Sequence, residues 1–489
     1  MSIATEQPAQ PRRWRLLTPR KVIAAIVLLL VAAPLGYRAI ELLSTPDVGE
    51  PFDLEAFRAY TLPDEKNAFT HYRKVVALLV SEQNVLDANP SIQPKDFWDS
   101  ETAAEEEWAR AIPAVRQWVA LNRSALDEWK RGADCEESLQ LSPDQVATTG
   151  PLDGDVISLR NCSRLEGLEA MRLLSEGHPA EAWECCRNLL RASRHLSMHA
   201  TLMGSLIAGA VVDFGVRGGV IWSSHKNVDA ALLRRAIRDV EAVDRIETPP
   251  SDAIKLEYIG LRLFATKGII GGTEIPAWLR YSGYPAQVGR TARLVVANLL
   301  TQADRPRYLR TAVHPGKLAL FELDPSGTAD PNLRPPEEIE RSAVTSAPFV
   351  EKVLQRVVPV PALEIGACDP QMMNGSLHYA IQANDTSQTR RSALLLALAL
   401  ELHYREHREF PASLDELVKN GYLKSIPIDP FGKGEPFRYR RETGPRPAAV
   451  VWSVWLDGID QGGFDVPANN KDWGLRVVAP DASAASATQ

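Results

Sequence analysis

The sequence predicts a mainly α-helical protein with an N-terminal transmembrane helix, a helical domain of solenoid-like helix pairs and a small α+β domain at the C-terminus. Three features lead to this prediction. An apolar run follows a basic N-terminus, apolar residues then recur at helical spacing through most of the chain, and the C-terminal segment alternates like short strands. We divide the chain into a basic cytoplasmic tail (1–21), a membrane anchor (22–43), an exported helical domain (44–385), the α+β domain (386–478) and a disordered tail (479–489).

The predicted anchor is the apolar run between Val22 and Ile40, which Arg38 alone interrupts with a charge. At about 1.5 Å of rise per residue, this helix nearly crosses a hydrocarbon core of about 30 Å. Basic residues precede the run and acidic residues follow it, so the positive-inside rule exports the bulk of the chain. A cleavable signal peptide is the alternative, but Pro34 would then follow the cut, a poor position for a processing enzyme. We expect a single-pass protein of the inner membrane with its bulk in the periplasm.

Length and composition indicate globular material of about two or three domains. The chain has 489 residues, 45% of them hydrophobic and 24% charged, with a net charge of -7. This acidic balance, without a basic stripe that alternates with aromatic residues, argues against nucleic acid as a partner. Five cysteines allow at most two disulfides in an oxidising compartment. Cys135 and Cys162 are the plausible pair, and buried free thiols are the alternative.

The exported region is predicted to consist of amphipathic helices. One apolar stripe is formed by Phe69, Tyr72, Val75, Val76 and Leu79, and residues 157–222 have the pattern of stacked helix pairs. The helix pair around the turn at Gly177 resembles a single tetratricopeptide-type repeat, with Ala170 and Ala182 where that repeat packs its helices. The resemblance covers one repeat and implies a helix-pair scaffold.

Residues 202–222 are apolar enough to suggest a second membrane span, with Gly215 and Gly219 at the spacing of a transmembrane helix contact. Asp213 and Arg217 lie inside this segment, and each charge at the centre of a span costs roughly 2.5 to 3.5 kcal/mol. Because they are spaced like neighbours on a helix surface, the two charges can pair. We interpret the segment as the central buried helix of the soluble domain.

Further helices are expected near 229–246, 251–267, 287–302 and 337–357, with a proline-rich link at 324–336. A new module then begins around 385–389. An apolar helix at 393–404 leads to Phe410-Pro411, and the turn-forming run Asp429-Pro430-Phe431-Gly432 precedes two short alternating segments that end at Asp457-Gly458. These patterns predict a small antiparallel sheet packed on the helix.

The order of these motifs resembles the C-terminal half of the major pseudopilin of type II secretion, over roughly residues 392–463. In that family a helix and a Tyr/Phe-Pro turn lead to a Leu-Pro-x-Asp-Pro-(Trp/Phe)-Gly loop, a Tyr-bearing strand and a strand that ends in Asp-Gly. True pseudopilins carry a prepilin leader directly before their apolar helix, and no such leader is evident before Val22. We therefore do not expect a fibre subunit. The whole layout also resembles uncharacterised membrane-anchored families of planctomycete bacteria, which imply no activity.

The pseudopilin resemblance implies a calcium site in the loop after the Asp-Gly turn. The matching positions are Asp457, Asp460 and Asp465. Calcium takes about six to eight oxygen ligands, which carboxylates and turn carbonyls can supply together. A glycine-rich hairpin with solvated aspartates is the alternative. No other cofactor is expected.

Other motifs give less support for a metal site or a catalytic site. His195 and His199, and again His403 and His407, have the spacing of metal ligands on one helical face, but neither pair belongs to a His-Glu-x-x-His motif. Partly exposed helix residues are the alternative for both pairs. The sequence contains no phosphate loop, dinucleotide fingerprint, Cys-x-x-Cys or Gly-x-Ser-x-Gly motif, so an enzymatic activity is unsupported.

Three functions from different classes are therefore considered. The preferred one is an envelope interaction protein, anchored in the membrane, whose helical domain offers a groove and whose terminal module docks a partner or stabilises the assembly. The second is a component associated with a type II secretion-like system. The third is a hydrolase with its site between helices, which a pocket that brings His195 or His199 together with carboxylates would favour.

Overall fold

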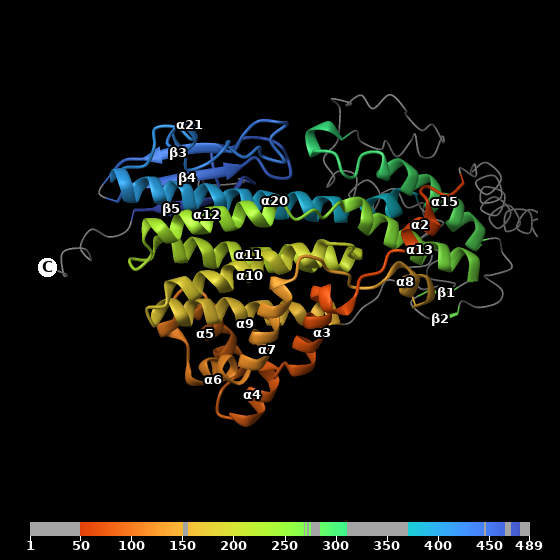
Figure 1. The fold of residues 1–489 in the computed structure, drawn as a ribbon, viewed down its shortest axis with the longest axis horizontal. Helices are drawn as coiled ribbons and strands as arrows, with labels where there is room; N and C mark the ends of the chain where they lie inside the picture. Colours follow the sequence, from red (N-terminus) through yellow and green to blue (C-terminus); the bar gives the residue numbers. More distant parts are fainter. Residues whose placement is uncertain are drawn as a thin grey trace, which may run out of the picture. The chain divides into compact units, whose positions relative to one another are not determined.

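Most elements of the computed structural model are helices, and a small sheet lies near the C-terminus (Figure 1). The structure describes residues 49–149, 155–267, 269–270, 273–274, 284–310, 370–444, 446–464 and 471–479. The predicted basic tail, membrane anchor, proline-rich link and helix at 337–357 lie outside these residues, as does the C-terminal tail beyond 479. The predicted mainly α fold with a small C-terminal sheet is confirmed.

Short helices form the first part of the described chain, and local capping signals set their ends. Asn67 and Ser81 accept hydrogen bonds from the first turns of two helices, and prolines open two others. These elements are α2 (Leu54–Arg58), α3 (Ala68–Leu78), α4 (Glu82–Ala88), α5 (Pro94–Ala104), α6 (Pro113–Leu121), α7 (Arg123–Asp134) and α8 (Pro143–Thr149). The predicted face of α3 is buried through Phe69, Tyr72 and Val75.

Long helices follow: α9 (Asp155–Ser175), α10 (Pro179–Ser197), α11 (Leu202–Ser224) and α12 (Ala230–Asp244). The predicted helix pair is α9 and α10, and the turn between them uses Gly177 at a φ of 85°. A further long helix, α20 (Pro370–His407), lies beside α11 and α12, while α10 lies against α9 and α11 (Figure 1). The long helices therefore share one core.

Among the helices that the structure describes, α11 is the one long and apolar enough to cross a membrane. It packs inside the fold against α9, α10 and α20. A Cβ at Gly215 would lie 3.1 Å from Leu189 of α10, and one at Gly219 would lie 3.0 Å from Leu394 of α20. The glycines therefore serve close contacts between helices of this fold. The predicted pair is present, with Arg217 Nε 3.2 Å from Asp213 Oδ2.

A second core forms around α13 (Pro250–Lys267) and α15 (Tyr284–Leu300), which pack on each other. It contains Tyr258 of α13, Val295 of α15 and Leu377 near the start of α20. A short hairpin, β1 (Ile269–Ile270) and β2 (Thr273–Glu274), follows α13, and a single 3-10 turn, η3 (Arg307–Leu309), follows α15. The first turns of α20 thus belong to this second core.

The C-terminal sheet has three antiparallel strands in the order β3-β4-β5: β3 (Arg438–Glu442), β4 (Ala448–Ser453) and β5 (Trp473–Val478). All residues of β4, the central strand, are buried, while β3 is only half-buried. The short helix α21 (Asp415–Lys419) and the last turns of α20 pack nearby. A helix on a small antiparallel sheet is the arrangement that the sequence predicted here; β5 was not assigned as a strand.

The helix predicted at 393–404 is longer at both ends and crosses the predicted domain boundary at 385–386 without a break. Two of the polar residues that suggested a boundary, Asp385 and Thr389, are buried and have partners. Asp385 forms an ion pair with Arg310, and Thr389 donates to the Asp385 carbonyl. Arg391 pairs with Asp244 of α12 at 2.6 Å. The helical region and the sheet consequently share α20, and the described residues belong to one compact unit.

Candidate functional site

The aspartates of the predicted calcium loop are hydrogen-bonded to the loop itself. Asp457 accepts from Ile459 N at 3.0 Å and from Gln461 Nε2 at 2.8 Å. Asp460 Oδ1 accepts from Gly462 N at 2.9 Å and from Trp452 Nε1 at 3.0 Å, and its Oδ2 lies 3.3 Å from Arg438 Nε. Asp465 lies outside the described residues.

Asp472, which the sequence analysis did not select, joins this loop because its Oδ2 accepts from Gln461 N at 3.0 Å and from Gly463 N at 2.9 Å. Within the described part of the chain, no group of three or more His, Cys, Asp or Glu residues is placed to hold a metal ion. The oxygens of Asp457 and Asp460 point to N–H donors, and Asp460 already faces the cation of Arg438. The described residues thus form a hydrogen-bonded turn, and calcium binding stays a prediction.

Asp429, in the turn-forming run, fixes its loop to the end of β4. Its carboxylate is buried and accepts from Ser453 Oγ at 2.7 Å, Phe431 N at 3.0 Å and Val454 N at 3.0 Å. Burial raises the pKa of Asp429, and the hydrogen bonds oppose that rise because they favour the charged carboxylate. Asp429 therefore has a positioning role in the loop.

The loops 428–434 and 455–463, which we call the terminal loops, present apolar side chains to solvent. Ile428 is 45% exposed and Ile459 is 60% exposed. In the same region, the centroid of the Trp455 ring lies 5.3 Å from that of Phe431 and 5.5 Å from that of Trp473. The terminal loops thus combine two exposed isoleucines, an aromatic cluster and backbones that are held by aspartates.

The first predicted histidine pair does not share a helical face. Helix α10 ends at Ser197, so His199 lies beyond it, at a φ of 43°. His195 is buried and its Nδ1 lies 2.9 Å from the Tyr72 hydroxyl, whereas His199 Nδ1 lies 2.7 Å from Asp252 Oδ2. Burial lowers the pKa of His195 to about 3, and the charge of Arg191 lowers it further. The two histidines therefore do not share a ligand face, because the helix ends between them, and His195 is buried rather than partly exposed.

The second pair lies on one face of α20, as its spacing predicts. The rings of His403 and His407 are 4.5 Å apart. His403 Nδ1 lies 2.9 Å from the Glu409 carbonyl, and His407 Nε2 lies 3.1 Å from the Tyr422 hydroxyl. Both rings are therefore hydrogen-bonded to groups that order the turn after α20.

The described cysteines are free thiols, which is the alternative that the sequence left open. Cys135 and Cys162, the plausible disulfide pair, are not bonded to each other. Cys135 Sγ instead contacts the Arg131 carbonyl at 3.5 Å. Burial raises the pKa of Cys162 and of Cys186 to about 12, so neither thiol is a nucleophile at neutral pH.

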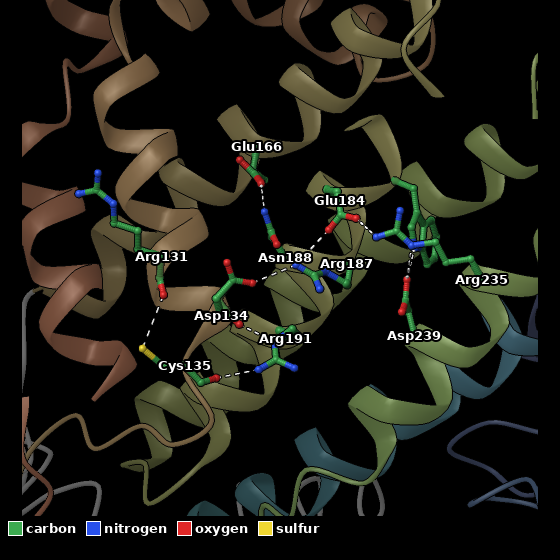
Figure 2. A network of polar contacts seen from close by, with 12 residues as sticks. Arg131, Asp134, Cys135, Glu166, Glu184, Arg187, Asn188, Arg191, Arg235 and Asp239 are labelled. Carbon is green, nitrogen blue, oxygen red and sulfur yellow. Dashed lines mark hydrogen bonds and ion pairs between the residues drawn. The ribbon is translucent and has the colours of Figure 1, made fainter. Parts of the chain in front are cut away.

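A buried carboxyl group lies where α9 meets α10 (Figure 2). Glu166 Oε1 accepts from Asn188 Nδ2 at 3.0 Å, and burial raises the pKa of Glu166 to about 8. Around it, Arg187 pairs with Asp134 at 3.0 Å and with Glu184 at 3.0 Å, which joins α10 to the end of α7 (Figure 2). At neutral pH this carboxyl group is mostly protonated, and the surrounding ion pairs are structural contacts between helices.

The described residues also form a pocket of about 340 Å³, whose lining residues come from α9, α11 and α20. We call it the arginine pocket. It is lined by Arg160 of α9, by Gly209, Ala210, Asp213, Phe214 and Arg217 of α11, and by Arg390 of α20. The spacing of Asp213 and Arg217 predicts their pair, but no sequence pattern indicates the pocket, because Arg160 and Arg390 come from helices that are distant in the chain.

The charges in the arginine pocket are only partly paired. Asp213 lies 3.2 Å from Arg217 Nε and 3.5 Å from Arg390 Nε. Arg217 also pairs with Glu105 at 3.1 Å, outside the lining. Burial and the charge of Arg217 lower the pKa of Arg390, although it stays a cation at neutral pH. The pocket therefore offers a positive field to an anion.

Among the described residues, no histidine or cysteine lines the arginine pocket, and the lining supplies guanidinium groups, one carboxylate and apolar surface. This set of groups suits binding of an anion by charge-assisted hydrogen bonds. Comparison with models of protein families, with curated proteins and with solved structures found no match.

Proposed function

We propose that this protein is a single-pass, membrane-anchored scaffold of the cell envelope, held in the inner membrane by the run between Val22 and Ile40. Its exported helices and C-terminal sheet form one platform, and the terminal loops contact a protein partner. The observation that carries this proposal is the exposure of Ile428 and Ile459 on loops with a fixed backbone.

Preorganisation supports a binding role for the terminal loops. Asp429 ties one loop to β4, and Asp457 and Asp460 close the other on itself. Loops that are already ordered lose little conformational entropy when a partner binds, and exposed apolar side chains then gain free energy from burial. Two exposed isoleucines suit a protein surface with a complementary apolar patch.

A second candidate is a component associated with a type II secretion-like system. What supports it is the resemblance of residues 392–463 to the pseudopilin C-terminal half, together with an apolar helix that packs on an antiparallel sheet next to the Asp429 loop. In this case the terminal loops would contact a secretion component. The two candidates differ in the identity of the partner and agree on the surface that binds it.

Photocrosslinking in intact cells tests this proposal. A photoreactive amino acid replaces Ile459 in the full chain, and the matched control carries it at Leu121, an exposed apolar position at the end of α6. We expect the Ile459 variant to capture a defined envelope protein that the Leu121 variant does not capture. A secretion component as the captured protein would favour the second candidate. Equal capture at both positions, or capture only at Leu121, would contradict the proposal.

Full-length variants are needed here because truncation at the predicted boundary would cut α20. That helix contributes Leu377 to one core and Leu394 to the other. A chain that ended near residue 385 would lose the turns of α20 that pack on α11 and α12, so its lost interactions could reflect unfolding. Single substitutions at exposed positions avoid that ambiguity.

A further inference from the structure

We propose that the arginine pocket binds a phosphate group. Its lining carries three guanidinium groups and one carboxylate, Asp213, so it has an excess of positive charge. Guanidinium groups bind phosphate oxygens through paired, charge-assisted hydrogen bonds. A cavity of about 340 Å³ is large enough for a phosphate with a small organic group attached. This site is separate from the terminal loops and independent of the scaffold proposal.

Two of the three arginines have hydrogen-bonding capacity left for a ligand. Arg160 is exposed, and no described residue forms an ion pair with it. Arg390 donates through Nη1 to the Gly209 carbonyl at 2.6 Å, which orients its guanidinium. Its Nε is buried and makes no hydrogen bond to any described residue. Arg217 is the least available of the three, because Asp213 and Glu105 both pair with it.

A buried hydroxyl near the pocket adds a separate observation. Ser387 of α20 is 4% exposed, and its Oγ has no hydrogen-bond partner among the described residues. It lies 3.9 Å from the position of a Cβ on Gly209, a lining residue. Buried polar atoms without partners are rare in native proteins and often mark a bound ligand or water. Ser387 Oγ is thus a buried polar atom without a partner among the described residues, and Arg390 Nε, 3.5 Å from Asp213, makes an ion pair but no hydrogen bond.

Next to the arginine pocket, towards the N-terminus of α11, a stripe of apolar residues follows the helix. Met203, Leu206, Ile207 and Ala210 recur at helical spacing on α11; Met203 and Leu206 are exposed, and Ile207 and Ala210 are partly exposed. Ile157, one turn before Arg160 on α9, is also exposed. The same face therefore has a cationic end and an apolar end. A phosphate group with an apolar chain, as in a phospholipid headgroup, would use both ends, whereas a soluble phosphate ester would use only the arginines.

Calorimetric titration of the full chain in a non-ionic detergent tests the phosphate site, with glycerol phosphate as the soluble probe. We expect saturable binding that Arg160→Gln weakens about tenfold, the effect of one lost charge-assisted contact. Arg160 is exposed, so this variant should fold normally. The matched control is Arg238→Gln on α12, an exposed arginine without an ion pair to any described residue. It makes the same charge change and should bind like the parent.

A second titration, with dihexanoylphosphatidic acid below its micelle concentration, distinguishes the two sources of phosphate. Tighter binding of this lipid than of glycerol phosphate, reduced by Leu206→Ser on the apolar stripe, would assign the site to a phospholipid headgroup. Equal affinity for the two probes would assign it to a soluble phosphate ester. Absence of binding by both probes, equal weakening in the Arg160 and Arg238 variants, or equally tight binding of succinate would each overturn the phosphate site.

Discussion

At the scale of single residues, buried ionisable groups tie the helices together, and they also set how stability depends on pH. Burial raises the pKa of Glu166 to about 8 from an ordinary value of 4.5. Between pH 4.5 and about 8, the folded protein therefore keeps a proton on Glu166 that the unfolded chain releases. The stabilisation from this proton is complete below pH 4.5 and is lost as the pH rises to about 8.

Glu166→Gln should remove this loss, because the amide stays neutral and can still accept from Asn188. We expect the variant to match the parent near pH 4.5 and to be more stable by about 4 kcal/mol at pH 8, since each unit of pKa shift corresponds to about 1.4 kcal/mol. Urea unfolding at several pH values measures this difference. Glu107→Gln, at an exposed position, is the control and should show no such trend.

His195 makes the stability depend on pH in the opposite direction. Comparing the Glu166→Gln variant with the parent separates the contribution of Glu166 from that of His195. Burial lowers its pKa to about 3 from an ordinary value of 6.5. Its contribution is complete above pH 6.5 and is lost as the pH falls towards 3. This loss occurs equally in the parent and in Glu166→Gln, so their difference reports Glu166 alone. A difference that stayed constant from pH 4.5 to 8 would contradict the assignment of a buried, protonated Glu166.

At the scale of elements, the glycines of α9 and α11 have different roles. A Cβ on Gly167 of α9 would meet no atom within 4 Å. A Cβ on Gly215 of α11 would lie 3.1 Å from Leu189 Cβ and 3.3 Å from the Cys186 carbonyl. Gly167 thus lowers the stability of α9 through its poor helix propensity and serves no close contact. Gly215, in contrast, allows α10 and α11 to approach closely.

Alanine at these two positions should therefore change stability in opposite directions. Gly167→Ala should stabilise the protein by up to about 1 kcal/mol through helix propensity. Gly215→Ala should destabilise it by about 1 to 3 kcal/mol, since backbone and a Cβ atom must move to make room. The free energy of unfolding in urea measures both changes. Stabilisation by both substitutions would show that α10 and α11 do not pack as closely as described.

Local sequence signals were sufficient to predict many of these elements. The turn at Gly177, the buried face of α3, the Asp213–Arg217 pair and a small antiparallel sheet after an apolar helix all followed from spacing and turn chemistry. The first and last residues of α20 could not be predicted from these local signals. Asp385 and Thr389 resemble a linker by composition, and only their partners, such as Arg310, show that a helix buries them.

The candidate site shows the same limit. The sequence located the aspartates after the turn at Gly458, but their hydrogen bonds within the loop depend on backbone geometry that composition does not specify. It could not bring Arg160 and Arg390 together, because they lie on helices that are distant in the chain and meet only across α11. The spacing of His195 and His199 suggested a shared helical face, but α10 ends at Ser197, between the two residues.

At the scale of the whole molecule, α20 joins the two parts that the sequence analysis separated. Its first half packs in the core of α13 and α15, and its second half packs on α11, α12 and the sheet. Arg405, near its end, donates to the carbonyls of Ser223 and His225 at 2.9 and 3.1 Å, where α11 ends. The described part of the molecule from residue 49 onwards should therefore unfold cooperatively and present the terminal loops on a rigid support.

Hydrogen exchange on the full chain and on Leu394→Ala tests this central claim most directly. Leu394 is fully buried and contacts Gly219 of α11, so the variant should lose about 2 to 5 kcal/mol. If α20 unites the molecule, amides in α10, α11 and β4 should all lose protection by the same free energy. Loss of protection confined to α20 and β4, with α10 and α11 unchanged, would show that the sheet and the helical region are separate units.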